Sequence, residues 1–129
     1  MKKKILIVIA DYYQNIAKGL LNSSLSLIPK ESSVKIIKVP GVFEIPVTIS
    51  KNIKKYDAFL ALGCVIKGKT PHFDFISQAT TNAIMDLSIH SRKPIGNGII
   101  TCLSMKQAII RKKKGAEAAN AILSVLSQK

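Results

Sequence analysis

The apolar residues of this chain alternate between continuous runs and a helical period, and this alternation constrains the fold more than any other feature. A continuous apolar run predicts a buried strand over residues 5–9, and further strands are predicted over 34–39, 58–66 and 94–102, the last of them interrupted by glycines. Apolar positions spaced by three or four residues predict helices over 15–27, 44–54, 71–89, 105–111 and 115–126. The first helix is expected to bury Ile16, Leu20, Leu21, Leu25 and Ile28. Strands that alternate with helices require crossovers, so we expect a three-layer α/β/α sandwich with a four-stranded parallel sheet and helices on both faces.

Length and composition favour a single cytoplasmic domain, residues 1–129. No apolar stretch approaches the roughly 20 residues of a membrane span. The short run after the N-terminal lysines is followed by Asp11 and two tyrosines instead of a small-residue cleavage site, so no signal peptide is expected. Cys64 and Cys102 lie in apolar, strand-like surroundings and are expected to be reduced thiols. Neither has the spacing of a metal ligand, and no metal is expected.

The net charge of +13 comes from lysines spread along the whole chain, with Arg92 and Arg111 as the arginines. Such a charge could bind nucleic acid or another polyanion. However, the sequence contains no basic stripe interleaved with aromatic residues and no RNA-binding motif. We therefore expect neither a nucleic-acid nor a membrane partner. The positive field would still steer a phosphorylated substrate.

Residues 63–70 fit the pattern G-x-x-x-x-G-K-T, the phosphate loop of nucleotide-binding proteins. Two features argue against that interpretation. The apolar run continues beyond Gly63 to Ile66, as in a strand that passes through the glycine, and Pro71 suits the first position of a helix that begins only there. A nucleotide binder remains an alternative, but a phosphate near residues 68–70 is expected in either case.

Polar residues follow three of the predicted strands. Tyr12 comes after the first, Glu44 after the second, and residues 67–72 with His72 after the third. The carboxyl ends of parallel strands share one edge of a sheet, so an aromatic ring, a carboxylate, a phosphate cradle and a histidine are expected to converge there.

Residues 40–46 (PGVFEIP) and 62–74 (LGCVIKGKTPHFD) closely resemble the two signature segments of the lumazine synthase family. Residues 95–101, 107–111 and 114–119 resemble its C-terminal segments in the same order. The resemblance implies a flavodoxin-like fold. It also implies condensation of 5-amino-6-(D-ribitylamino)uracil with 3,4-dihydroxy-2-butanone 4-phosphate to 6,7-dimethyl-8-ribityllumazine, the penultimate step of riboflavin synthesis. The family uses no cofactor and no metal.

The resemblance also implies roles for individual residues. Tyr12 would stack on the pyrimidine, Val42-Phe43-Glu44 would bind the ribityl chain, and Gly68-Lys69-Thr70 would hold the phosphate. His72 would move protons, because imidazole works in both directions near neutral pH. Arg111 would bind phosphate and Glu117 would pair with the histidine, both from a neighbouring subunit. The remaining substrate-binding positions are Val65, Ile66, Lys67, Asn97 and Lys114.

Family resemblance further implies a homopentamer with active sites between subunits, and a contact with riboflavin synthase is a related expectation. A short connection after Arg111 and the absence of an N-terminal extension favour an isolated pentamer over a larger shell. Asp11 stands where many members carry arginine, and Asn97 where many carry an aromatic residue. These departures motivate an alternative, a non-catalytic binder of flavin or lumazine on the same scaffold.

Overall fold

Four parallel strands form the middle layer of the computed structural model, which describes residues 2–69 and 71–128. The strands are β1 (Lys4–Ala10), β2 (Ser33–Val39), β3 (Ala58–Ile66) and β4 (Ile95–Cys102), and their order across the sheet is β2-β1-β3-β4. All three pairings are parallel, so every connection crosses over one face of the sheet.

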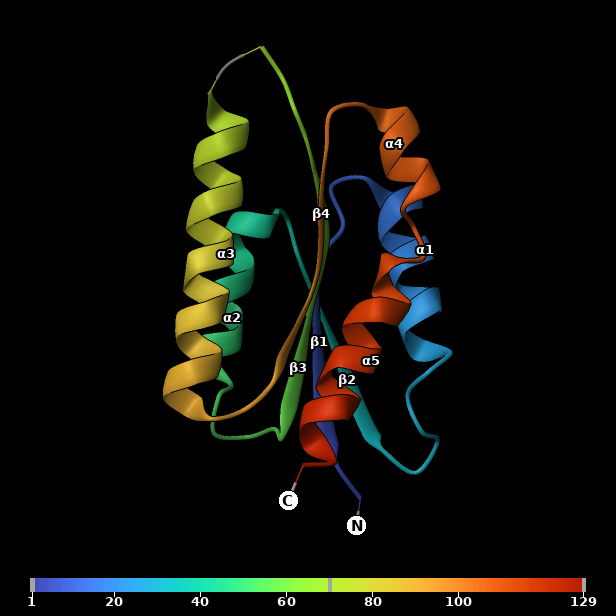
Figure 1. Ribbon diagram of the computed structural model, residues 1–129, viewed down its shortest axis with the longest axis vertical. Coiled ribbons are helices and arrows are strands. Elements are labelled where there is room, and N and C mark those ends of the chain that lie inside the picture. The colour runs from blue at the N-terminus through green and yellow to red at the C-terminus, as the bar shows by residue number, and fades with distance from the viewer. Residues whose placement is uncertain (1, 70, 129) are drawn as a thin grey trace.

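Helices cover both faces of this sheet (Figure 1). One face carries the short 3₁₀ turn η1 (Val42–Glu44), α2 (Ile45–Lys51) and α3 (His72–Ser91). The other carries α1 (Gln14–Leu25), α4 (Met105–Ile110) and α5 (Lys114–Leu126). The predicted three-layer, flavodoxin-like sandwich is thus confirmed.

The alternation of side chains along the central strands divides the core into two clusters. Ile5, Ile7 and Ile9 of β1 pack toward α1 and α5, whereas Leu6 and Val8 pack toward η1 and α2. All five are buried, as the continuous apolar run predicts for a strand covered on both faces.

The observed helix ends differ from the predicted ones by up to three residues. The second helix ends at Lys51 instead of residue 54, because Asn52 caps it and donates its side-chain amide to the Thr48 carbonyl at 2.8 Å. The third begins at His72, and Pro71 is its N-cap, whose carbonyl accepts the Asp74 amide at 3.1 Å.

The predicted inward position of Leu25 in α1 is wrong. Leu25 is 37% exposed, and Ser24 is fully buried in its place. The Ser24 hydroxyl donates to the Leu21 carbonyl at 2.8 Å, so this polar side chain meets its hydrogen-bonding requirement inside the core.

The strands are staggered at their carboxyl ends. The pairing of β1 with β3 ends at Ile9 and Leu62, whereas β3 continues beside β4 until Ile66 pairs with Cys102. Residues 64–66 of β3 therefore extend beyond the end of β1. Because Gly63 lies within this strand and is buried, it does not begin a phosphate loop, and α3 begins only after Pro71. Residues 63–69 therefore do not form the strand–loop–helix geometry that a nucleotide-binding phosphate loop requires.

Gly115 permits a close contact between α5 and α1. A Cβ atom at Gly115 of α5 would collide with the Leu20 carbonyl oxygen of α1 and would lie 2.6 Å from the Ser23 hydroxyl. The Ser23 hydroxyl also hydrogen-bonds the Lys112 carbonyl at 3.2 Å, which joins α1 to the chain just before α5. This contact fixes the start of α5 against α1.

Candidate functional site

A cavity of about 710 Å³, which we call the main cavity, opens at the carboxyl ends of β1 and β3. It lies where the stagger of the strands leaves the last residues of β3 uncovered by β1. Its lining combines the end of β3 with the segments after β1 and β2 and the start of α3: Ala10, Tyr12, Tyr13, Gly41, Val42, Phe43, Glu44, Cys64, Val65, Ile66, His72 and Ile76. The structure thus brings the aromatic ring, the carboxylate and the histidine of the sequence prediction to one cavity.

Gly63 allows the wall of this cavity to form. A Cβ atom there would lie 2.7 Å from a methyl carbon of Val42 and 3.2 Å from Ala10. The absence of a side chain lets Val42 pack directly on the strand, and Val42 is accordingly buried. Phe43, the next residue, is instead 61% exposed at the rim.

Tyr12 projects from the segment between β1 and α1. Its ring meets the ring of Tyr13 edge to face, with centroids 4.9 Å apart and an interplanar angle of 84°. Tyr12 is 75% exposed. An exposed aromatic face on a cavity wall is suited to stacking on a flat heterocycle.

Glu44 turns its carboxylate back onto the chain that enters η1. One carboxylate oxygen, Oε1, accepts the backbone N–H of Gly41 at 3.1 Å. This bond fixes the position of the carboxylate in the cavity wall. A carboxylate can accept several hydrogen bonds, so the group is suited to hydroxyl donors on a ligand.

His72 is the first residue of α3 and lies exposed at the cavity. Just before it, Gly68 and Lys69 are exposed, and a Cβ atom added at Gly68 would meet nothing within 4 Å. The described part of this segment does not line the cavity: Lys67, Gly68 and Lys69 lie outside it. Thr70, the last member of the predicted phosphate cradle, falls outside the described residues.

A second cavity, of about 520 Å³, which we call the cationic cavity, brings together three of the predicted residues, Arg111, Lys114 and Glu117. It lies between the end of β4 and the chain from α4 into α5, and its lining is Ile99, Ile100, Thr101, Ile110, Arg111, Lys113, Lys114 and Glu117. Arg111 donates from Nη1 to the Thr101 carbonyl at 3.3 Å, and Lys114 pairs with Glu117 at 3.3 Å. Three cationic side chains therefore surround this cavity, which is a suitable environment for a phosphate group.

The two cavities have no lining residue in common. Within one protomer, His72 and Arg111 consequently belong to different cavities. Asn97 lines neither of them; it is exposed on β4, where its side-chain oxygen accepts the Ile99 N–H at 3.1 Å.

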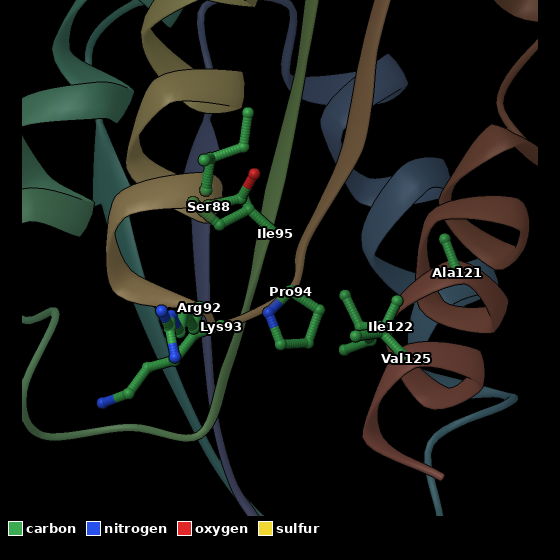
Figure 2. A pocket seen from close by; sticks show the side chains of 9 residues that line it. Ser88, Arg92, Lys93, Pro94, Ile95, Ala121, Ile122 and Val125 are labelled. Carbon is green, nitrogen blue, oxygen red and sulfur yellow. The ribbon is translucent and has the colours of Figure 1, made fainter. Parts of the chain in front are cut away.

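A further hollow, of about 360 Å³, lies at the opposite end of the sheet, where α3 ends and β4 begins. Figure 2 shows Pro94 facing Ile122 and Val125 across it. The Lys93 ammonium instead donates to the Ile53 carbonyl at 2.7 Å. The residues predicted for the active site do not line this hollow.

The main cavity also contains residues that the sequence did not single out, among them Tyr13 and Cys64. Burial raises the pKa of the Cys64 thiol to about 12, and the nearby Cys102 adds to the effect. Burial also raises the pKa of Tyr13, with smaller contributions from Tyr12 and Cys64. No signal in the sequence marks Cys64 as a cavity residue, because its place there depends on how far β3 extends beyond β1.

Residues 2–69 and 71–128 show neither a cluster of metal-ligating side chains nor a helix that could span a membrane. In this part of the chain, histidine, cysteine and acidic side chains form no group of three or more that could hold a metal ion. None of the helices described there is both long and apolar enough to span a membrane.

Comparison with known proteins identifies the family. The family model described as 6,7-dimethyl-8-ribityllumazine synthase matches residues 2–129. The protein of that name from Bartonella tribocorum is 42% identical, over all of this chain and 93% of its own length. Those from Bartonella henselae and Cutibacterium acnes are 43% and 37% identical, over 99% and 96% of this chain and 89% and 80% of their own lengths. With this similarity along the whole sequence, the chain belongs to the 6,7-dimethyl-8-ribityllumazine synthase family.

Proposed function

We propose that this protein condenses 5-amino-6-(D-ribitylamino)uracil with 3,4-dihydroxy-2-butanone 4-phosphate to give 6,7-dimethyl-8-ribityllumazine, the penultimate step of riboflavin synthesis. The observation that carries the proposal is the cavity lined by Tyr12, Glu44 and His72 in a chain that matches this family over residues 2–129. The amine of the pyrimidine attacks the ketone and water leaves. Phosphate is then eliminated, and ring closure releases a second water.

In this proposal the main cavity holds the pyrimidine and its ribityl chain. Tyr12 stacks on the ring, while Val65 and Ile66 provide an apolar wall at the end of β3. The ribityl hydroxyls bind the backbone of Val42 and Phe43 and the carboxylate of Glu44. The Gly41 bond to Glu44 supports this role, because it holds the carboxylate in place before the ligand arrives.

The phosphate of the butanone lies between the segment before α3 and the cationic cavity. Lys67, Gly68, Lys69 and Thr70 supply the first side of this site. The N-terminus of α3 adds a favourable partial positive charge. Arg111 and Lys114 supply the second side. The planar guanidinium can bind two phosphate oxygens at once.

His72 transfers the protons. Its place at the start of α3, on the cavity that holds the pyrimidine, supports contact with the reacting amine. Imine formation, phosphate elimination and ring closure each move a proton, and an imidazole can accept and donate one at neutral pH. Glu117 orients this histidine from an adjacent copy.

The complete site forms between two copies of the chain, with the main cavity of one meeting the cationic cavity of the next. Two observations support this arrangement: the cavities share no residue, and each lies near exposed apolar side chains. Phe43 and Val47 are 61% and 57% exposed on the first side, and Leu103 and Ile110 are 63% and 73% exposed on the second. A contact between two different surfaces is head-to-tail and closes into a ring, for which we propose five members. Asn97, on the edge strand β4, would reach the substrate across the same contact.

The proposal includes a cytoplasmic location and a contact with riboflavin synthase, the enzyme that uses the product. Co-sedimentation of the two purified proteins tests that contact. Sedimentation of this protein alone tests the ring, because a pentamer of 14.1 kDa chains has a mass of about 70 kDa.

The activity is tested by the appearance of the fluorescent lumazine from the two substrates, measured above the uncatalysed background. Clear catalysis by the wild-type protein is expected. A folded oligomer that binds lumazine but does not accelerate its formation would favour a non-catalytic binder on this scaffold.

The composite site is tested by mixing two variants, His72→Ala and Arg111→Ala, unfolding them together and refolding them. Each variant alone is expected to be nearly inactive. In a random equal mixture, about one contact in four joins an intact His72 to an intact Arg111, so activity should return to about a quarter of the wild-type value. No recovery in properly assembled mixed rings would place both residues in the same protomer's site.

A further inference from the structure

The helix α4 carries Arg111 at its C-terminal end. It spans only Met105–Ile110, and a helix of this length has little stability of its own. Arg111 is its C-cap residue, so its position depends on whatever holds α4 in shape. Ala108 is the one residue of α4 that is buried, which gives the helix a single apolar anchor.

The first turn of α4 is held by two reciprocal hydrogen bonds. The Ser104 hydroxyl accepts the backbone N–H of Gln107 at 3.3 Å. The side-chain oxygen of Gln107 reaches back and accepts the backbone N–H of Leu103 at 2.8 Å. This arrangement resembles a capping box and satisfies backbone donors at the start of the helix.

Further hydrogen bonds connect this cap to Arg111. The Arg111 N–H donates to the Gln107 carbonyl at 3.1 Å and to the Ala108 carbonyl at 3.2 Å. Its guanidinium donates to the Thr101 carbonyl at 3.3 Å. The Arg111 carbonyl then accepts the Lys114 N–H at 3.0 Å, which connects the arginine to the start of α5. Gln107 thus joins the cap to the arginine within a single turn.

We propose that Ser104 and Gln107 are positioning residues that hold the Arg111 guanidinium in place for the phosphate of the substrate. The inference rests on the proposed function, in which Arg111 binds that phosphate. The cap fixes the first turn of α4, and the last turn of the same short helix fixes the backbone of Arg111. The Thr101 carbonyl then sets the direction of its side chain.

The cap stabilises α4 itself and contributes little to the stability of the whole fold. Ser104 is exposed and Gln107 is half-buried, whereas the core on this face consists mainly of buried residues from β1, β3, α1 and α5. Loss of the cap should therefore loosen α4 without unfolding the chain. The expected defect is in binding the phosphorylated substrate, with little change in the binding of the pyrimidine.

The test compares Ser104→Ala, Ser104→Thr and Gln107→Ala. The two alanine variants should raise the KM for the butanone phosphate by about three- to thirtyfold, the range expected for loss of a helix cap. The KM for the pyrimidine and kcat should stay close to wild type. Ser104→Thr keeps a hydroxyl and should restore binding. Ser26→Ala serves as a matched control, because this exposed hydroxyl lies at the end of α1 and bonds the Ser23 carbonyl.

A double-mutant cycle shows whether the cap acts through the arginine. In an Arg111→Ala background, Ser104→Ala should produce no further rise in the dissociation constant for inorganic phosphate, because the group that it positions is gone. The inference would be overturned if the effects of Ser104→Ala and Arg111→Ala simply multiplied in the double variant. It would also be overturned if Ser104→Ala raised the KM values for the pyrimidine and the butanone phosphate equally.

Two measurements without turnover separate this inference from the proposed function. Hydrogen exchange should become faster in residues 103–111 of the Ser104→Ala and Gln107→Ala variants, with α3 unchanged. The dissociation constant for inorganic phosphate should rise by the same factor as the KM. Absence of synthase activity in the wild-type protein would reject the enzyme, while unchanged exchange and unchanged phosphate binding in the variants would reject the positioning role.

Discussion

The ring of Tyr13 meets the ring of Tyr12 edge to face, with their centroids 4.9 Å apart. Tyr13 packs against the core, whereas Tyr12 is 75% exposed. The partly buried Tyr13 therefore supports the exposed Tyr12 and limits the directions in which the Tyr12 ring can turn. This relationship gives the cavity an aromatic surface that is oriented before any ligand binds.

Replacing Tyr12 by alanine should raise the KM for the pyrimidine about tenfold, because stacking of a base on an aromatic ring is worth roughly 1–3 kcal/mol. Tyr12→Phe keeps the ring and should bind like wild type. Steady-state kinetics with the pyrimidine varied at saturating butanone phosphate measure the effect. A loss of equal size in Tyr12→Phe would assign the role to the hydroxyl instead of the ring.

Replacing His72 by alanine should lower kcat about 10²- to 10⁴-fold, the usual contribution of a well-placed acid–base group. Binding of the lumazine product, measured by its fluorescence, should be largely retained. His90→Ala is the matched control: His90 lies at the far end of α3, where its ring contacts the Asp86 carbonyl at 2.7 Å. An equal loss of kcat in both variants would remove His72 from the proposed chemistry.

Replacing Gly115 by alanine should destabilise the protein by about 1–3 kcal/mol, because the new methyl group has no room beside the Leu20 carbonyl and the Ser23 hydroxyl. The contact between α1 and α5 would have to open. Gly68→Ala provides the comparison, since a Cβ atom there meets nothing within 4 Å and should leave stability unchanged. Urea unfolding at equal protomer concentration measures both, and similar midpoints would show that α5 can shift at little cost.

Stability should fall as the pH rises from about 9 toward 12, and Cys64 should account for part of the loss. Burial raises the pKa of this thiol to about 12 from an ordinary value of 9.0. In that window the unfolded chain releases the thiol proton while the folded chain retains it, so unfolding becomes more favourable. In Cys64→Ala this part of the loss should disappear. Denaturant unfolding at pH 8, 9, 10 and 11 provides the comparison, and identical pH profiles for the two proteins would contradict the assignment.

The central strands β1 and β3 could be predicted closely from the sequence, because burial on both faces leaves a continuous apolar run. The segment Ala58–Ile66 was predicted with its observed bounds. The helix ends were less accurate, since they depend on individual caps such as the bond from Asn52 to Thr48, which hydrophobic periodicity does not reveal. Leu25 was misplaced for a related reason: periodicity treats leucine as the better core residue, but Ser24 occupies the buried position with its hydroxyl bonded to Leu21.

The candidate site was only partly predictable. Tyr12, Glu44 and His72 could be brought together because each follows a strand of a parallel sheet. Tyr13 and Cys64 were missed, since their place in the cavity depends on how far β3 extends beyond β1, which is a property of strand register. The assignment of Arg111 to a neighbouring subunit came from the family resemblance alone, whereas the finding that His72 and Arg111 line different cavities requires the three-dimensional arrangement of the sheet edge.

The stagger between β1 and β3 also determines how the protein would respond to its ligands. Much of the cavity is built from the end of a strand, a 3₁₀ turn and the first residues of a long helix. Such walls have few conformations to lose, so binding should order little of the chain and most of the interaction energy should appear as affinity. Selectivity would then change through substitutions at Cys64, Val65 and Ile66, which line the cavity at the end of β3. Longer or shorter loops around the site would have much less influence on which molecules fit.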